Sequence, residues 1–453
     1  MRTAWLVLAV ALGPALSTAA LAQDNDEAAL ALADRTQVEA AAPRTCIEYS
    51  ELAATDTTYS DGAGPSGGGR GSFAIRCDDA LAPQWRVVVS DRFDDFFAQG
   101  APNEPIDTLK EAYLSFRSNS ELVDVGRINV RQGVGFAYNP TDYFRADATR
   151  ALISIDPDTL RDERLGTLMA RSQTLWSSGS LTAIVAPQVS AEPNDSAFNP
   201  DFGATNGRSR WLIILSQRVA QAFQPQLLLT QAEHGSPQIG LDLTHLLDNA
   251  TVAYLEYSGG RAPSNLALSA YEPAVSEPLV LESAVPEAPA PGAAGLSQPA
   301  GSGPTVSGAT AFRSRLSTGL TYTTTYKLSV TLEYEYDNAA PDNAEWNVLR
   351  GGPIPLYVQY REYAGTQGEL ATRQNVFAYA HWDDVIINRL GLTAFVRYDP
   401  YDHSRVSWAE ARYHWERHLG LALQWQRNAG DATSDEAPWP VRQSWLALID
   451  YYF

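Results

Sequence analysis

The sequence predicts an all-β fold: a closed antiparallel transmembrane β-barrel of about 16 strands, or 18 if a hairpin around Cys46 and Cys77 joins the barrel. Three observations support this prediction. The chain begins with an apolar leader, alternates apolar and polar residues through most of its length, and carries an aromatic residue, Phe453, at its end. Period-two alternation is the signal of a strand with one apolar and one wet face. Strands of about ten residues, tilted by about 45°, cross the hydrocarbon layer of a membrane.

Composition excludes several classes of protein. The 453 residues carry a formal net charge of -20. An excess of acidic residues argues against a nucleic-acid partner, because phosphate contacts depend on basic patches. Two cysteines are too few for a disulfide-rich scaffold or for a cysteine-rich zinc site.

Residues 1–22 are predicted to be a cleaved signal peptide. Arg2 precedes an apolar run from Ala4 to Leu16, and Ala20-Leu21-Ala22 fits the small-residue cleavage pattern. A membrane anchor is the alternative, but the apolar run is too short to span a bilayer. The chain is therefore expected to be exported.

Residues 23–83 are predicted to form an N-terminal periplasmic segment with a disulfide-clamped hairpin. Cys46 and Cys77 each belong to a short strand-like run, and antiparallel pairing of these runs would bring the two cysteines together. A disulfide there would stabilise the fold by about 3–4 kcal/mol in the chain-entropy model. A free redox or metal-binding pair is the alternative, which no C-x-x-C motif supports.

Residues 84–453 are predicted to form the barrel. Alternation is clearest in 327–336, where every even position is apolar or aromatic and every odd position is polar or charged. An even number of strands is typical of bacterial single-chain barrels, whose termini both lie in the periplasm. The sixteen expected strands lie near 84–92, 106–116, 121–130, 167–176, 180–190, 209–217, 222–232, 237–245, 250–259, 312–323, 326–336, 374–382, 389–398, 406–416, 419–427 and 441–453.

The connections between these strands alternate in length, as short periplasmic turns and long outer loops should. The long ones all fall on one side of the barrel: 93–105, 131–166, 191–208, 260–311, 337–373 and 428–440. The longest, 260–311, contains a low-complexity stretch, Ser276 to Pro304, that has too few large apolar residues to order itself.

The last strand resembles the C-terminal strand of outer-membrane barrels. Trp445, Ala447, Ile449, Tyr451 and Phe453 share one face. The resemblance implies a Gram-negative outer-membrane location, contact with lipid and lipopolysaccharide, and recognition of Phe453 by the barrel-assembly machinery. A secreted soluble β-protein is the structural alternative, but it would need a second layer to cover so many apolar faces.

The stretch from Gly126 to Asp142 is similar to a motif of porin-like outer-membrane families, including alginate-export-like barrels. In those families a strand ends in Gly-Arg and is followed by a Gly-x-Gly turn, often with a preceding Trp, and by Asn-Pro-x-Asp. Here Gln132 stands where that Trp would be, and the detailed resemblance extends over roughly Ala112 to Pro187. It implies a channel that passes or exports a hydrophilic solute or polymer. The alternative is a non-conducting surface barrel whose loops bind a partner or support envelope assembly.

The same stretch predicts a loop at the barrel mouth or inside its lumen, and charges of both signs follow it. A mixed-sign constriction would orient polar solutes; the alternative is a solvated outer loop whose charges pair with one another. Inward-facing Phe395 and Trp408 are candidates for stacking against a solute. The predicted pore-lining or constriction residues are Arg127, Arg131, Asp142, Arg145, Arg150, Arg171, Arg313, Arg315, Glu333, Glu335, Arg397, Glu410 and Arg412.

No enzymatic activity, cofactor or metal is expected. Residues 64–68 match G-x-S-x-G but lie in a glycine-rich loop without the strand-to-helix turn that exposes the serine. The six histidines form no H-E-x-x-H motif, and the acidic clusters have no EF-hand spacing. A barrel lipase that pairs a serine with a histidine is the remaining enzymatic alternative.

Overall fold

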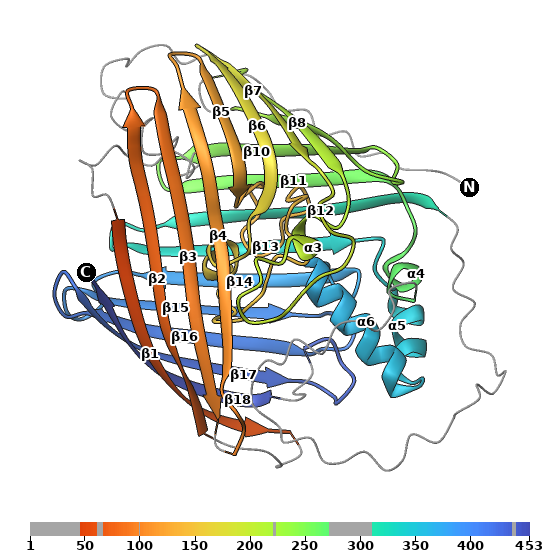
Figure 1. Cartoon of the computed structure of the whole chain (residues 1–453). Coiled ribbons are helices and arrows are strands. Elements are labelled where there is room, and N and C mark those ends of the chain that lie inside the picture. The colour runs from red at the N-terminus through yellow and green to blue at the C-terminus, as the bar shows by residue number, and fades with distance from the viewer. Residues whose placement is uncertain (1–45, 61–66, 99, 221–222, 271–309, 437–440) are drawn as a thin grey trace, which may run out of the picture. The chain divides into compact units, whose positions relative to one another are not determined.

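The computed structural model contains one 18-stranded antiparallel sheet that closes on itself (Figure 1). The structure describes residues 46–60, 67–98, 100–220, 223–270, 310–436 and 441–453. Closure occurs because β1 pairs with both β2 and β18, so every strand has two hydrogen-bonded neighbours. The predicted signal peptide, the low-complexity stretch and Ser66 lie outside the described residues.

The strands follow one another around the barrel in chain order. Their bounds are β1 Cys46–Tyr59, β2 Gly67–Ala82, β3 Trp85–Ala98, β4 Glu104–Arg117, β5 Glu121–Ile128, β6 Thr167–Trp176, β7 Gly179–Ala186, β8 Arg210–Gln217, β9 Gln226–Ala232, β10 Gln238–Asp248, β11 Thr251–Ala262, β12 Ala311–Thr323, β13 Leu328–Asp337, β14 Gln374–Trp382, β15 Leu390–Tyr398, β16 Arg405–His414, β17 Leu419–Ala429 and β18 Val441–Tyr452. The helices lie in the connections: α2 Pro157–Asp162, α3 Phe202–Thr205, α4 Asn265–Ser269, α5 Asn343–Arg350 and α6 Ile354–Gln367.

The barrel prediction is confirmed, and the hairpin question that the sequence left open is settled. The sixteen predicted strands correspond to β3 to β18. The cysteine hairpin forms β1 and β2, so the strand number is 18 and the sheet begins at Cys46 rather than near residue 84. Cys46 pairs with Cys77 in the β1–β2 register, and the two form a disulfide.

One predicted long loop, 93–105, is wrong. β3 continues to Ala98 and β4 begins at Glu104, which leaves only a short connection between them. The reason is β2, which extends far enough to pair Gly68 with Ala98 and so supplies hydrogen-bond partners to the end of β3.

The outward face of the sheet is apolar and the inward face is polar. On β13 the outward Leu332 is 57% exposed, whereas the neighbouring inward Glu333 is 1% exposed. Outward leucines and isoleucines of other strands, such as Leu423 and Ile449, are also about half exposed in the isolated chain. A closed sheet with an apolar outer face satisfies its backbone hydrogen bonds internally, as a lipid environment requires. No helix in the described ranges is long and apolar enough to cross a membrane.

The two ends of the barrel differ. Short turns and the C-terminus lie at one end, where the Phe453 N–H donates to the Glu48 carbonyl oxygen at 3.0 Å. Helices α4, α5 and α6 gather at the opposite end (Figure 1). Recognition of Phe453 by the assembly machinery stays a prediction.

Replacement of both Cys46 and Cys77 by serine should yield a barrel that still folds but unfolds more readily. The disulfide links two adjacent strands across 31 residues of chain, so its loss should cost about 3 kcal/mol through the entropy of the unfolded chain. Guanidinium unfolding in lipid bilayers, followed by tryptophan fluorescence, measures this difference. Equal midpoints for the variant and the oxidised wild type would contradict it.

Candidate functional site

The connection between β5 and β6, residues 129–166, lies inside the barrel and is held there by wall carboxylates. Glu256 of β11 is fully buried and accepts hydrogen bonds from the backbone N–H groups of Val134 at 2.8 Å, Gly135 at 2.7 Å and Thr141 at 2.7 Å. The Thr141 hydroxyl donates a further bond to Glu256 at 2.8 Å. One carboxylate thus binds both arms of a tight backbone turn.

A second wall carboxylate, Glu333 of β13, binds the segment between these arms. It accepts hydrogen bonds from three consecutive backbone N–H groups, those of residues 136–138, at 2.5, 3.1 and 3.0 Å. The Tyr254 hydroxyl donates to the same carboxylate at 2.6 Å. Bonds in which the acceptor is charged are stronger than neutral ones, so both glutamates hold the loop firmly.

The Gly-x-Gly motif of the sequence forms the turn that approaches these carboxylates. Gly133 has φ +100°, and a Cβ there would lie 2.6 Å from Glu256 Oε1. A Cβ on Gly135 would lie 2.2 Å from the Tyr138 carbonyl oxygen. Gln132 donates to Asp242 of β10 at 2.9 Å, so the residue that replaces the usual Trp fastens the loop to the wall.

A buried cluster of ion pairs connects the outer loops to the inward loop. Glu369, which follows α6, pairs with Arg145 of the inward loop at 3.0 Å and with Arg315 of β12 at 3.1 Å. Burial alone would raise the pKa of Glu369, but the guanidinium groups of Arg315 and Arg145 outweigh it and lower that pKa. Tyr138 also donates to Glu369 at 2.9 Å.

Two cavities remain in the part of the lumen that the inward loop does not fill. The larger, of about 530 Å³, lies toward the termini, where Tyr49 and Tyr452 line it. The smaller, of about 120 Å³, lies toward the long connections, where Tyr59 and Val441 line it. The two share five wall residues: Arg70, Ile153, Ser154, Trp408 and Gln424. We call these five residues the constriction.

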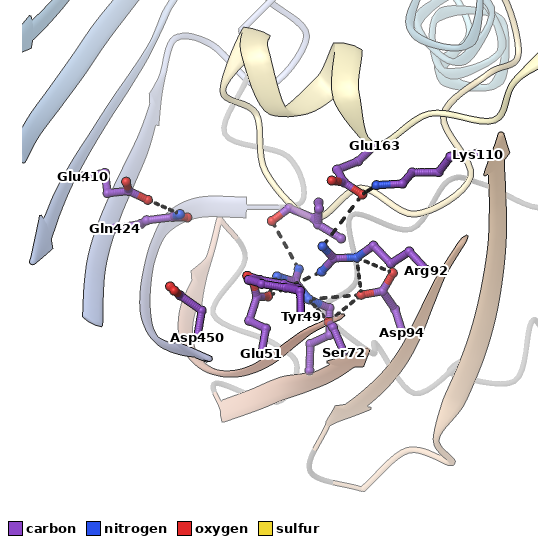
Figure 2. Close-up of polar contacts among 12 residues, drawn as sticks. Tyr49, Glu51, Ser72, Arg92, Asp94, Lys110, Glu163, Glu410, Gln424 and Asp450 are labelled. Atoms are coloured by element: carbon purple, nitrogen blue, oxygen red, sulfur yellow. Dashed lines mark hydrogen bonds and ion pairs between the residues drawn. The ribbon is translucent and has the colours of Figure 1, made fainter. Parts of the chain in front are cut away.

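One side of the constriction is built by an ion network on β1, β2 and β3 (Figure 2). Glu51 of β1 lies opposite Ser72 of β2, which lies opposite Asp94 of β3. Arg70 donates to Glu51 and, at 3.2 Å, to the Ile153 carbonyl oxygen of the inward loop. Arg70 therefore links the barrel wall to the loop at the narrow point.

The same network continues toward the larger cavity. Arg92 donates to Asp94 at 3.0 Å and lies 3.8 Å from Glu163 of the inward loop. Lys110 of β4 donates to Glu163 at 2.8 Å. Wall cations and a loop carboxylate are thus paired along one side of the larger cavity (Figure 2).

The other side of the constriction combines polar and aromatic side chains. Gln424 of β17 donates to Glu410 of β16 at 2.7 Å. Trp408 stacks on Phe395 with ring centroids 5.4 Å apart, and Ile155 of the inward loop packs against this cluster. Residues 152–155 therefore extend from Arg70 to the aromatic wall, and the smaller cavity lies between them and β1, β17 and β18.

Three of the predicted pore residues line the larger cavity: Arg131, Glu410 and Arg412. Arg131 pairs with Asp162 at 2.7 Å. Arg412 pairs with Glu410 at 2.9 Å and with Asp450 at 2.6 Å.

The other ten predicted pore residues line neither cavity and instead hold loops or wall strands in place. Arg127, only 2% exposed, donates to the carbonyl oxygens of Gly166 and Pro200, and Arg150 donates to those of Asn199 and Ser196. The remaining contacts are Asp142 with Arg164, Arg145 and Arg315 with Glu369, Arg171 with Asp124, Arg313 with the Asn338 carbonyl oxygen, Glu333 with residues 136–138, and Glu335 with Arg397.

The two aromatic residues predicted to stack against a solute also differ in whether they line a cavity. Phe395 lines neither cavity, because it is 5% exposed between Phe377 and Trp408. Trp408 lines both cavities at the constriction. Of the two predicted stacking residues, only Trp408 lines these cavities.

Sequence reasoning missed the wall residues of β1 to β4: Glu51, Arg70, Arg76, Arg92, Lys110 and Glu111. The sequence leaves open whether this hairpin joins the barrel. Several outward positions of β1 are small or polar, as Ala54, Asp56 and Thr58 show, so the apolar signal of this strand is weak. A usable signal was the inward alternation Glu51, Ala53, Thr55, Thr57, which pairs in register with Arg70 and Ser72.

Among the described residues, no group of three His, Cys, Asp or Glu side chains is placed to hold a metal ion. The larger cavity is lined by six carboxylates and six basic side chains, which balance. This lining suits contact with polar solutes. Its carboxylates accept hydrogen bonds and its basic side chains donate them, so solute groups of either charge can find a partner.

Comparison with solved structures places the fold among outer-membrane porins. OccK5 (OpdH) of Pseudomonas aeruginosa superposes with a TM-score of 0.51 at 8% identity, covering 90% of this chain and 97% of that one. OccAB1 of Acinetobacter baumannii gives 0.50 at 10% identity, covering 90% and 95%. OccK2 (OpdF) of Pseudomonas aeruginosa, solved in complex with glucuronate, gives 0.51 at 8% identity, covering 90% and 97%.

No protein-family model matches the chain, and no curated protein is significantly similar to it in sequence. The structural neighbours and the apolar outer face together support the predicted porin-like fold and outer-membrane location.

Alanine at Glu256 or Glu333 should free the inward loop. Each variant removes three backbone hydrogen bonds to a charged acceptor, and such bonds contribute about 1.5–3 kcal/mol each. Amide hydrogen exchange within residues 133–141 should accelerate at least about tenfold. Glu410→Ala is the matched control, since this lumen carboxylate accepts only side-chain bonds. Unchanged exchange in both variants would contradict the anchoring role.

Proposed function

We propose that this protein is an outer-membrane channel through which small hydrophilic solutes diffuse past the constriction. The observation that carries the proposal is the pair of cavities on either side of the constriction, which share Arg70, Ile153, Ser154, Trp408 and Gln424 as walls. A route that passes these residues would connect the long-loop end of the barrel with the end that holds the termini.

The size of the passage favours small solutes over polymers. The smaller cavity holds about 120 Å³, whereas sites that enclose a drug-sized ligand hold about 300–1,000 Å³. The inward loop is fixed to the wall at several points, so widening for a polymer would break buried ionic contacts. We therefore favour passage of a small solute over export of a polymer.

The charge balance favours weak ion selectivity. Six carboxylates and six basic side chains line the larger cavity, and they pair with one another, as Arg131 does with Asp162 and Arg412 with Glu410. A paired lining offers local hydrogen bonds without a net field of one sign. The neighbour solved with glucuronate supports a small polar solute as the cargo.

The first experiment is reconstitution in planar bilayers with recording of single-channel currents at several salt concentrations. Discrete current steps that increase with salt are expected from a water-filled passage. A folded, heat-modifiable barrel that gives no current would overturn the proposal and favour the non-conducting surface barrel whose loops bind a partner.

Replacement of Arg70 by methionine should widen the passage. Arg70 is the side chain that bonds the Ile153 carbonyl oxygen at the constriction, so its loss should raise the unit conductance by roughly two-fold, since pore diameter sets the flow. The matched control is Arg86→Met, because Arg86 pairs with Asp78 and lines neither cavity. A conductance equal to that of the wild type would place the narrowest point elsewhere.

Charge reversal at Arg131 should shift selectivity toward cations. This side chain is one-third exposed in the larger cavity, so Arg131→Glu should raise the cation-to-anion permeability ratio by roughly two- to three-fold at low salt. Reversal potentials across a salt gradient measure the ratio. Arg405→Glu, at an exposed position that lines neither cavity, is the control. Identical reversal potentials for both variants would contradict the assigned path.

A further inference from the structure

A group of carboxylates lies where three connections of the long-loop end meet. Asp399 and Asp402 belong to the β15–β16 connection, Asp435 and Glu436 to the β17–β18 connection, and Glu335 lies near the end of β13. Two guanidinium groups face them, Arg361 of α6 and Arg397 of β15. Five acids thus share two cations in a buried place, which leaves negative charge that protons can neutralise. We call these five acids the outer carboxylate cluster.

The cluster fastens residues 430–436 to the neighbouring connections. Asp402 accepts hydrogen bonds from the Trp346 indole N–H at 2.9 Å and from the Asp435 backbone N–H at 2.7 Å. The Glu436 backbone N–H donates to the Ser404 hydroxyl at 2.9 Å. A change of charge here therefore acts on contacts between separate loops.

Helix α6 binds the same segment from its other side. The Tyr357 hydroxyl and the Arg361 guanidinium both donate to the Ser434 carbonyl oxygen, each at 2.8 Å. These bonds require Asp435 and Glu436 to stay close to the acids of the other loops.

Two features of the hydrogen bonding indicate protons in the cluster. Glu335 is fully buried, and its Oε1 has no hydrogen-bond donor among the described residues, while its Oε2 accepts from Arg397 at 2.8 Å. The Asn375 amide bonds the Tyr398 and Gln374 carbonyl oxygens, each at 3.2 Å, when its nitrogen points to them. Its oxygen then faces Asp435 Oδ2 at 3.4 Å, a pairing that favours a protonated acid.

The pKa values of the loop acids agree with this geometry. Burial, followed by the charges of Asp435 and Asp402, raises the pKa of Asp399 to about 7. Burial, followed by the charge of Asp435, raises the pKa of Glu436 to about 8. Burial also raises the pKa of Asp435, against the opposing effect of Arg361 and Arg397.

We propose that the outer carboxylate cluster is a pH-sensitive fastening that holds residues 430–436 against α6 when it is protonated and releases them when its protons are lost. Release would reach the proposed passage, because the β17–β18 connection leads into Val441, which lines the smaller cavity. The effect on current rests on the proposed channel function, whereas the fastening itself does not.

The direction of the pH dependence follows from which of the two forms, fastened or released, binds protons more tightly. Asp399, Asp435 and Glu436 have raised pKa values in the fastened form, whereas acids released into water return toward about 4. The fastened form is therefore favoured at low pH and is weakened as pH rises through about 7 to 8. The charged and titratable groups that face Asp435 and Glu436 are Glu335, Tyr357, Tyr360, Arg361, Arg397, Asp399 and Asp402.

Amide hydrogen exchange of residues 430–436 between pH 6 and pH 9, corrected for intrinsic exchange rates, tests the fastening directly. In the wild type, protection should fall by at least about tenfold over this range, the effect of one unit of pKa change. The Glu436→Gln and Asp399→Asn variants, alone and combined, mimic the protonated acids and should keep protection at pH 9 within about threefold of its value at pH 6. Glu345→Gln, a half-exposed carboxylate of α5, should behave as the wild type.

Currents recorded over the same pH range complete the experiment. A wild-type conductance or open-state noise that rises with pH, and that is constant in the combined variant, is the expected result. Protection that does not change with pH in the wild type, or that falls equally in the combined variant, would overturn the fastening. Absence of current at every pH would instead contradict the channel, and the exchange result would still decide the fastening.

Discussion

Two glutamates of the barrel wall hold the backbone of the inward loop, and the interior of the protein depends on this interaction. Glu256 and Glu333 lie on strands that would otherwise present buried carboxylates without partners, at a high cost in desolvation. Six backbone N–H groups of residues 134–141 satisfy them. The loop backbone is irregular and has no strand partner of its own, so the same bonds also give its N–H groups acceptors. The wall and the loop thus each supply the hydrogen-bond partners that the other needs.

The position of the two cavities is a consequence of this anchoring. With its base fixed to β11 and β13, the inward loop fills the lumen beside β6 to β9, where Ile128, Phe144 and Leu212 pack together. The opposite side stays open, and its wall comes from the first and last strands of the chain. The constriction therefore combines residues of β2, β16 and β17 with a loop that begins after β5. Paired charges on that wall give a polar surface without an excess of one sign.

Strand positions could be predicted from the sequence because each strand carries its own period-two signal. The inward orientation of Glu333, Glu410 and Arg412 follows from the same alternation. Their roles could not be predicted, since the partners of Glu333 lie 195 to 197 residues away. A charged inward residue can line a passage or bind a folded loop, and alternation does not distinguish the two. Ten of the thirteen predicted pore residues line neither cavity and instead bind loops or neighbouring wall strands.

The hairpin shows a different limit. Outward residues of β1 such as Ala54 and Thr58 lack the large apolar side chains that mark the other strands, so the sequence predicts the disulfide but leaves open whether the hairpin joins the barrel. Pairing with β18, nearly 400 residues away, gives β1 its second neighbour and closes the sheet. Long-range pairing of this kind is set by the closure of the whole barrel rather than by local preference.

Closure between β1 and β18 also constrains the order of assembly. β1 can gain its second neighbour only after Val441–Tyr452, the last strand to leave the export machinery, has arrived. Until then β1 is an exposed edge that could pair out of register or with another chain. The Cys46–Cys77 bond joins the first two strands and can form while later ones are still being exported. An oxidising periplasm would thus fix the alignment of the edge on which the final strand must close.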